Sequence, residues 1–584
     1  MRHEDGWVQW TAVIVVVLAV VYGALARRHF DFGADPAAYA GVAASIIAGD
    51  GYWFNGRPHT LYPPGYPVLL VPVSWLSGDN YAALSAYTAV LAAIAVGAVA
   101  WYSRERLATH RWVPVLMVAF SAPYLAHAAS GVASEAPYTA VSVAFLACIE
   151  RLSRAEDRRV RPAVLLSAAL LLVATMAIRG VGLALFAAAG LTLVTRSVNA
   201  RRNGTASRAL DRVLLGAMAM AVPYAIGWAV WTSTARTPLY EGEYADTYGA
   251  QFRMVDPHEP DLGVASPSDI VARIPAGLVS QTTHAAELLT NAGWLLPVWY
   301  SVPMLLVLVG ALLGIVREVQ RPNPTMGWYV LSYAGLLVIW PFESVQRFLL
   351  PVFPLVAILV AAGLTWLVRA YEARKRWAEL LVFALPVAGV TGSVIASLGA
   401  RELSRQELAS LVAWIALAGV ALLVRRRGAG SMRLVRSSWL PHAFLIAFVA
   451  LGARSMASTI EARIDSAPER NDDVARASQW IRANTAPTDV IMAFAYSGLH
   501  YATGRSTVPF PVMRDPERLQ RTIVGLRPDY LLVEAPKPYE YFTPTQNERL
   551  EIIEAARLLR LREVARFDGT RMFRVLAVDS PNAP

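Results

Sequence analysis

Long apolar stretches alternate with short polar connectors over most of the 584 residues. A helix needs about 20 apolar residues to cross the hydrocarbon core of a bilayer. On that criterion we expect about 13 spanning helices. They begin near Trp7, Tyr81, Trp112, Ser134, Pro162, Gly180, Val213, Gly293, Met326, Arg347, Glu379, Glu407 and Trp439. The first stretch lacks a small-residue cleavage site, so we expect a retained span and not a cleaved signal.

The pattern changes to that of a water-soluble domain from about Ser458. Amphipathic periodicity predicts helices over 473–485 and 547–560. Apolar runs predict strands over 489–494, 529–534 and 571–578, and strands alternating with helices favour an α/β domain. The expected fold class is therefore an all-α polytopic membrane protein (residues 1–457) with a small C-terminal α/β domain outside the membrane (residues 458–584).

Composition and charge fit this division. Hydrophobic residues make up 55% of the chain and charged residues 16%, against about a quarter charged in soluble domains. The formal charge of +10 comes from Arg residues gathered in the connectors. That pattern marks cytoplasmic loops and argues against nucleic-acid binding. The amino terminus is then cytoplasmic, and the segments 27–80 and 234–292 form long loops on the outer side. The only cysteine, Cys148, supports no disulfide framework or zinc site.

A polar segment follows the first span: Asp31-Phe-Gly-Ala-Asp35-Pro-Ala-Ala-Tyr39. Asp31, Asp35 and Tyr39 are spaced one helical turn apart. Proline favours the first helical position, so Asp35 is expected to cap a helix that Pro36 opens. An unprotonated carboxylate beside an acceptor hydroxyl also suits a general base. Both roles are compatible.

The rest of this outer segment is short and rigid. Residues 36–47 are too few to span, so we expect an interfacial helix that lies along the membrane. The run Tyr62-Pro-Pro-Gly-Tyr-Pro67 forces an irregular backbone that either shapes a substrate pocket or serves as a connector. His59 and His284 are isolated, so a polar loop role is expected before metal ligation.

Further charges lie at the outer ends of spans: Glu135, Arg179, and Glu343 with Arg347. Ionisable groups near membrane depth are functional candidates because their burial is costly. The alternative for each is snorkelling to the headgroups. Two Arg and two carboxylates on one face would suit an anionic lipid headgroup and a hydroxyl acceptor.

The order of these motifs resembles that of the GT-C superfamily of membrane glycosyltransferases. The likeness is to its bacterial branch, which is similar to dolichyl-phosphate-mannose protein mannosyltransferases and aminoarabinose transferases. It rests on Asp35-Pro-Ala-Ala-Tyr39, the proline loop, Ser134-Glu135, Arg179-Gly-Val-Gly-Leu183 and Arg347-Phe-Leu-Leu-Pro351-Val-Phe-Pro354. Many members carry Asp-Glu where this chain has Asp35-Pro36.

The resemblance implies transfer of a sugar from a polyprenyl-phosphate carrier to a protein, lipid or glycan acceptor on the outer side of a bacterial plasma membrane. Asp35 would be the catalytic base. The implied substrate and lipid-phosphate contacts are Asp31, Tyr39, His59, Tyr62, Glu135, Arg179 and Arg347. The resemblance implies no definite cofactor, and a divalent metal stays open. The alternatives are a polytopic transporter and a non-catalytic membrane scaffold.

Overall fold

The computed structural model describes most of the chain outside one long segment. The described residues are 2–30, 32–106, scattered positions between 107 and 130, 131–154, 161–203, 208–243, 246–290, 302–342, 346–373, scattered positions between 375 and 384, 472–535 and 542–578. The spans expected near Glu407 and Trp439 lie outside these residues. Most of the spans expected near Trp112 and Glu379 do so as well.

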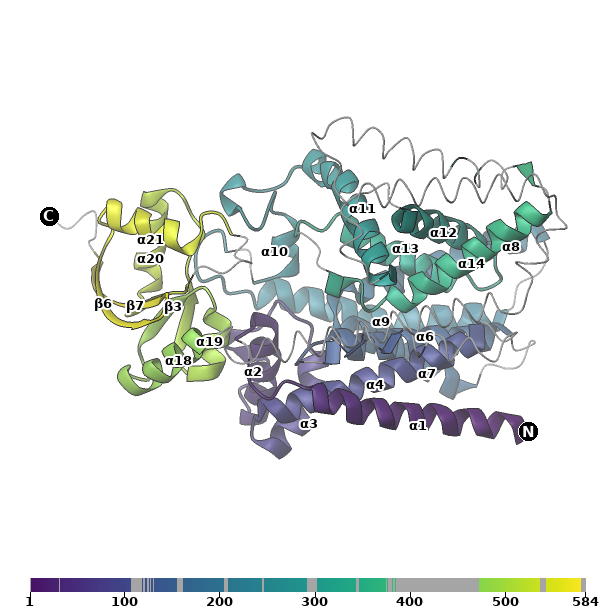
Figure 1. The fold of residues 1–584 in the computed structure, drawn as a ribbon, viewed down its shortest axis with the longest axis horizontal. Coiled ribbons are helices and arrows are strands. Elements are labelled where there is room, and N and C mark those ends of the chain that lie inside the picture. Colours follow the sequence, from purple (N-terminus) through teal and green to yellow (C-terminus); the bar gives the residue numbers. More distant parts are fainter. Residues whose placement is uncertain are drawn as a thin grey trace.

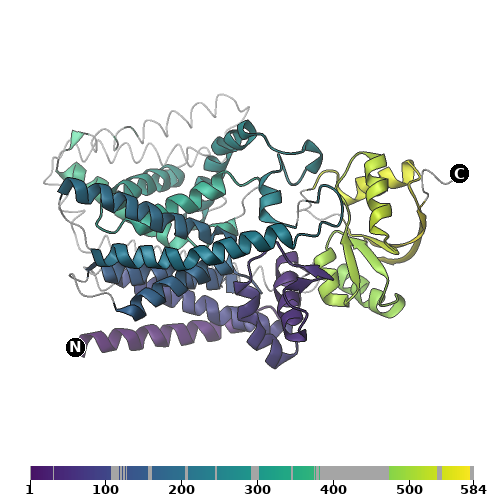
Figure 2. The same ribbon diagram turned by 180° about the vertical axis from the view of Figure 1, so that it is seen from behind.

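Long helices run side by side along the long axis of the molecule (Figures 1 and 2). Neighbouring pairs include α1 with α4, α4 with α6, α7 with α9, α8 with α13, and α12 with α14. The helices are α1 (Arg2–Leu25), α4 (Tyr81–Arg106), α6 (Glu135–Arg154), α7 (Pro162–Ile178), α8 (Leu183–Asn203), α9 (Arg208–Thr234), α11 (Pro267–Thr290), α12 (Val302–Val319), α13 (Thr325–Val338) and α14 (Phe353–Glu372).

Four helices in the described part of the chain are long and apolar enough to cross a membrane: Tyr81–Arg106, Gly180–Arg201, Ala209–Thr234 and Phe353–Tyr371. Large apolar side chains such as Ile226 and Val230 are exposed on the outside of the bundle. Such a surface suits lipid and not water. The described bundle is thus that of a mostly helical membrane protein.

The outer segment 27–80 folds into α2 (Ala34–Ala48), a hairpin of β1 (Trp53–Phe54) and β2 (Arg57–Pro58), and α3 (Gly65–Ser77). The expectation that Asp35 caps α2 is wrong. Gly33 is the N-cap and Asp35 lies in the first turn, because the helix begins two residues before Pro36. Helix α2 is largely buried against α3, β1 and the C-terminal domain, so it does not lie free along a membrane surface.

The segment 234–292, expected to be a long outer loop, is partly helical. It holds α10 (Tyr248–Phe252), a 3-10 turn at Pro260–Leu262, and the 24-residue α11. Helix α11 contacts α12, α13 and α14 and is therefore part of the bundle. Residues 235–266 remain as the outer part of this segment.

The C-terminal residues form a five-stranded sheet of order β4-β3-β5-β7-β6 with helices packed against it. The pairs β3–β4 and β3–β5 are parallel, and β5–β7 and β6–β7 are antiparallel. The elements are α18 (Asp472–Asn484), β3 (Val490–Ala493), α19 (Tyr496–Thr503), β4 (Ser506–Pro509), α20 (Pro516–Leu526), β5 (Tyr530–Val533), α21 (Gln546–Ala555), β6 (Leu559–Phe567) and β7 (Thr570–Val578).

The helix predicted over 547–560 is too long. Helix α21 ends at Ala555, and Leu559 already begins β6. Arg557 between them adopts a left-handed backbone with φ of 52°. That conformation interrupts a right-handed helix. The other helix and the strands predicted here are present as α18, β3, β5 and β7.

The C-terminal domain sits on one end of the bundle, the end opposite the amino terminus (Figure 1). Helix α19 packs on α2. The Asn55 amide donates to the Thr507 carbonyl at 2.7 Å, and the Thr507 N–H donates back to Asn55 Oδ1 at 3.2 Å. Arg514 Nη2 donates to Glu259 Oε1 at 2.6 Å. The domain therefore contacts both outer segments.

Candidate active site

Asp35 is held by two partners from distant parts of the chain. The Tyr62 hydroxyl donates to Asp35 Oδ1 at 2.5 Å. Arg347, in the 3-10 turn Gln346–Phe348, pairs through Nη2 with Asp35 Oδ2. The side chains of Asp35 and Arg347 are 29% and 42% exposed, so both remain accessible to a ligand.

A second, buried pair lies beside the first. Arg179 Nη1 is 2.8 Å from Glu135 Oε1 and donates to Ser134 Oγ at 2.9 Å. The Tyr39 hydroxyl lies 3.1 Å from the same Ser134 oxygen. Arg347 Nε is 3.8 Å from Glu135 Oε1 and joins the two pairs. The cluster thus alternates two carboxylates with two guanidinium groups.

Three of the four charged members stand at the end of an α-helix. Glu135 begins α6, Arg179 directly follows α7, and Asp35 is in the first turn of α2. Gly182 lets the chain turn sharply behind Arg179, since a Cβ there would lie 2.6 Å from the Met176 Cα. A carboxylate is favoured near a helix amino terminus by the helix dipole.

The electrostatics keep Asp35 ionised. Burial acts to raise the pKa of its carboxyl, but the Arg347 charge and the hydrogen bonds from Tyr62 and Arg347 outweigh it. The pKa of Asp35 therefore lies below its usual range. The Tyr62 phenol has a pKa well above its usual value, chiefly through burial and then through the Asp35 charge, so it remains a donor.

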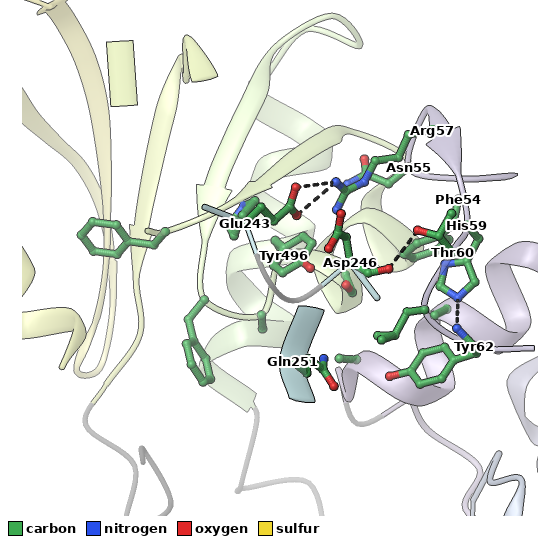
Figure 3. Close-up of a pocket in the computed structure, with 18 of the residues that line it drawn as sticks. Phe54, Asn55, Arg57, His59, Thr60, Tyr62, Glu243, Asp246, Gln251 and Tyr496 are labelled. Atoms are coloured by element: carbon green, nitrogen blue, oxygen red, sulfur yellow. Dashed lines mark hydrogen bonds and ion pairs between the residues drawn. The ribbon is translucent and has the colours of Figure 1, made fainter. Parts of the chain in front are cut away.

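His59 lies behind Tyr62 and does not touch the carboxylates through any hydrogen bond among the described residues. Its Nε2 accepts from the Tyr62 backbone N–H at 3.1 Å (Figure 3). Burial, with a smaller contribution from Arg57, lowers the pKa of His59 to about 3. His59 is thus a neutral acceptor that fixes the Tyr62 backbone.

A cavity of about 440 Å³ opens next to this cluster, between the bundle and the C-terminal domain. Its walls come from the first outer segment, from 237–251, from Phe342 and from the C-terminal domain. Figure 3 shows Tyr62 and His59 at one side and Glu243 and Tyr496 at the other. Tyr62 belongs to both the cavity wall and the Asp35 cluster.

Solved structures with similar folds cover nearly the whole chain. ArnT from Cupriavidus metallidurans in the apo state is 16% identical, with 98% of each chain covered and a TM-score of 0.50. The same protein bound to undecaprenyl phosphate is 17% identical, with 97% of this chain and 98% of that chain covered and a TM-score of 0.48. No protein-family model and no curated protein matches the chain.

AglB from Archaeoglobus fulgidus, an oligosaccharyltransferase in complex with an inhibitory peptide and a dolichol-phosphate, is 13% identical. It matches with a TM-score of 0.46 over 98% of this chain and 75% of its own. ArnT and AglB are both GT-C superfamily members. The chain has a GT-C fold.

The GT-C fold brings most of the sequence-predicted residues together. Asp35, Tyr39, Tyr62, Glu135, Arg179 and Arg347 form one connected cluster. His59 is linked to this cluster through its hydrogen bond with the Tyr62 backbone N–H. Asp31 and Glu343 lie outside the described residues. Within the described part of the chain, no three His, Cys, Asp or Glu side chains gather as a metal site, and Asp35 and Glu135 pair with guanidinium groups.

Sequence reasoning missed the polar residues that the segment 235–251 brings to this site. Arg57 Nη1 lies 3.1 Å from both carboxylate oxygens of Glu243. Tyr248 packs its ring 6.2 Å from that of Tyr62. The only signal was the richness of this segment in Tyr, Asp and Glu, which says nothing about its partners.

Proposed function

We propose that this protein is a glycosyltransferase that takes a sugar from a polyprenyl-phosphate donor and transfers it to an acceptor on the outer face of a bacterial plasma membrane. The observation that carries the proposal is the accessible Asp35–Arg347 pair next to a cavity. The GT-C fold shared with ArnT, an aminoarabinose transferase, supports it. Asp35 is the general base, and the donor phosphate binds Arg347.

Arg347 suits the donor phosphate better than Arg179 does. The Arg347 side chain is 42% exposed, whereas that of Arg179 is 14% exposed and already satisfied by Glu135 and Ser134. Guanidinium groups bind phosphate through charge-assisted hydrogen bonds. Arg179 then acts as a positioning residue that holds the Glu135 carboxylate beside Arg347.

Donor binding also prepares the base. When a phosphate shares Arg347, less of the guanidinium charge acts on Asp35, so the pKa of Asp35 rises from its lowered value toward the working pH. A base works best when its pKa lies near that pH. The cluster therefore couples occupation of the donor site to the basicity of Asp35.

The transfer step balances with these groups alone. The acceptor hydroxyl oxygen forms a bond to the anomeric carbon, and Asp35 takes the hydroxyl proton. The bond from the anomeric carbon to the phosphate oxygen breaks, and its electron pair leaves with polyprenyl phosphate. Arg347 neutralises the charge that develops there, as preorganised cations do in phosphate-leaving reactions.

The test follows release of polyprenyl phosphate from a panel of radiolabelled polyprenyl-phosphate sugars, with envelope extract as the acceptor source. The wild type is compared with Asp35→Asn and with Asp50→Asn, a matched control at an exposed position just beyond α2. We expect Asp35→Asn to lose about 10²–10⁴-fold in rate, and Asp50→Asn to keep the wild-type rate. No turnover with any donor, or equal turnover in Asp35→Asn, would refute the proposal.

A further inference from the structure

The cavity between the bundle and the C-terminal domain has no assigned ligand. We propose that it is the acceptor subsite of the enzyme and that it takes a neutral saccharide chain, with the C-terminal domain forming one of its walls. This inference rests on the proposed glycosyltransferase function. It adds the chemical class of the acceptor and a role for the domain.

The cavity is placed where an acceptor must lie. Tyr62 lines it, and the Tyr62 hydroxyl donates to Asp35 at 2.5 Å. Gly33 and Ala34, which directly precede Asp35, line it too. A hydroxyl group seated against Tyr62 is therefore within one hydrogen bond of the proposed base. The volume of about 440 Å³ lies within the roughly 300–1,000 Å³ range of small-molecule sites.

Aromatic rings make up a large share of the wall. They come from the first outer segment (Phe54 and Tyr62), from Tyr240, from Phe342 beyond α13, and from the C-terminal domain (Tyr496 and Phe510). Such rings offer apolar faces with polar tips. The faces of sugar rings carry C–H groups that stack on them, while their hydroxyl groups need planar hydrogen-bonding partners.

Those planar partners are present, and two of the three carboxylates are paired with an arginine. Arg57 Nη1 donates to both carboxylate oxygens of Glu243 at 3.1 Å. Asp246 pairs with Arg236 at 2.5 Å, and Glu534 Oε1 accepts from the Ala495 N–H at 2.9 Å. A phosphate-bearing acceptor would meet these carboxylates, while Arg57 and Arg236 are already paired with Glu243 and Asp246. A neutral saccharide has no charge to balance, so these side chains would serve it only as hydrogen-bond donors and acceptors.

A peptide acceptor fits the observations less well. Extended peptides commonly bind by adding a strand to an open sheet edge. Strand β4 is the sheet edge nearest the cavity, and Asn55 already bonds both the N–H and the carbonyl of Thr507 in its middle. The backbone at that position is therefore occupied by the protein itself.

The first test measures binding without the donor. The full-length protein in phospholipid nanodiscs is titrated with trisaccharides of glucose, galactose and mannose and with a Ser/Thr-rich heptapeptide, and saturation-transfer NMR reports contact. Val512→Trp places a large ring in the cavity wall, and Leu576→Trp makes the same kind of change at an exposed β7 position outside it. Tyr496→Ala removes one of the lining rings and serves as the second variant.

We expect at least one trisaccharide to bind the wild type and Leu576→Trp, and binding to weaken at least tenfold in Val512→Trp and in Tyr496→Ala. Binding that is unchanged in both cavity variants, or no trisaccharide binding at all, would overturn the proposal. Peptide binding that the cavity variants abolish would overturn the saccharide assignment.

The second test separates this inference from the proposed function. With an active donor, the ratio of sugar transferred to a trisaccharide over sugar released to water should fall at least tenfold in Val512→Trp and stay unchanged in Leu576→Trp. An unchanged ratio in Val512→Trp would reject the acceptor site while leaving the glycosyltransferase intact. Absence of any Asp35-dependent turnover would reject the function, while the binding result still decides what the cavity holds.

Discussion

Tyr62 joins the two parts of the site through a single side chain. Its hydroxyl donates to Asp35, its ring lines the cavity, and its backbone N–H is fixed by His59. Hydrogen bonds to charged groups are worth about 1.5–3 kcal/mol. The Tyr62 hydroxyl therefore helps Arg347 to keep the proposed base ionised and fixes its orientation.

Tyr62→Phe should shift the acid limb of the kcat/KM profile to higher pH. The lost hydrogen bond stabilised the ionised carboxylate, so the pKa of Asp35 rises and less base is available at low pH. We expect the midpoint of the acid limb to move up by about one pH unit, with little change in kcat/KM at pH 8. Tyr66→Phe is the control, because the Tyr66 hydroxyl contacts Thr88 at 2.7 Å and not the cluster. Identical profiles for the two variants would contradict this role.

His59 should make the protein less stable in acid. Its pKa of about 3 in the folded state lies below the ordinary value of about 6.5. Between these values only the unfolded chain binds the proton, so stability is complete above about pH 6.5 and declines as the pH falls. In His59→Gln, which retains an acceptor, the drop in Tm from pH 7.5 to pH 5 should shrink by a few degrees. A constant offset between the two Tm curves would contradict a neutral buried His59.

Among the elements, α12 and α14 approach most closely through glycines. A Cβ on Gly363 would lie 2.0 Å from the Gly310 carbonyl oxygen and 2.6 Å from the Gly314 nitrogen. Gly310 and Gly314 are four residues apart and share a face of α12. Small residues at this spacing let helices pack closely in membranes, where apolar burial alone does not drive association.

Gly363→Ala should lower the Tm, because its methyl group has to force α12 and α14 apart. Gly335→Ala on α13 is the matched control, since nothing lies within 4 Å of a Cβ there. Alanine is favoured over glycine in a helix by about 1 kcal/mol, so Gly335→Ala should keep or raise the Tm. The two thermal unfolding curves are measured in the same nanodisc. A Tm that changes in the same direction in both variants would argue against close α12–α14 packing.

Elements with a strong local pattern could be predicted from the sequence. Apolar length gave α4, α7 and α9, and periodicity gave α18. Strands β4 and β6 were missed because β4, Ser506-Thr-Val-Pro509, contains a single aliphatic residue, whereas β6 is an edge strand with many charges. Periodicity reports burial on one face, and neither strand shows a clear buried face in its sequence.

The same limit applies to the site. Asp35, Glu135, Arg179 and Arg347 were recognisable because a charge at the end of an apolar span is costly wherever the span packs. The Arg57–Glu243 pair was not, because its partners are 186 residues apart and meet only when two outer segments dock. No local pattern in either segment encodes that contact.

At the scale of the whole molecule, the two ends of the bundle carry different chemistry. The end that bears the C-terminal domain holds the Asp35 cluster. A buried cluster at the carboxyl ends of α4, α6 and α12 joins Arg106 to Glu150 and Glu318. Exposed Arg201 marks the carboxyl end of α8. Because short basic connectors remain in the cytoplasm, the end with Arg201 should be cytoplasmic and the C-terminal domain should lie outside.

Cysteine labelling tests this orientation. Cys148 is the only native cysteine, so Cys148→Ala provides a background in which Leu576→Cys on β7 or Arg201→Cys on α8 is the single thiol. Both positions are exposed. We expect a membrane-impermeant maleimide to label Leu576→Cys in intact spheroplasts, and Arg201→Cys only after permeabilisation. The reverse pattern would place Asp35 on the cytoplasmic side, where the acceptor and the donor would have to be sought among cytoplasmic molecules.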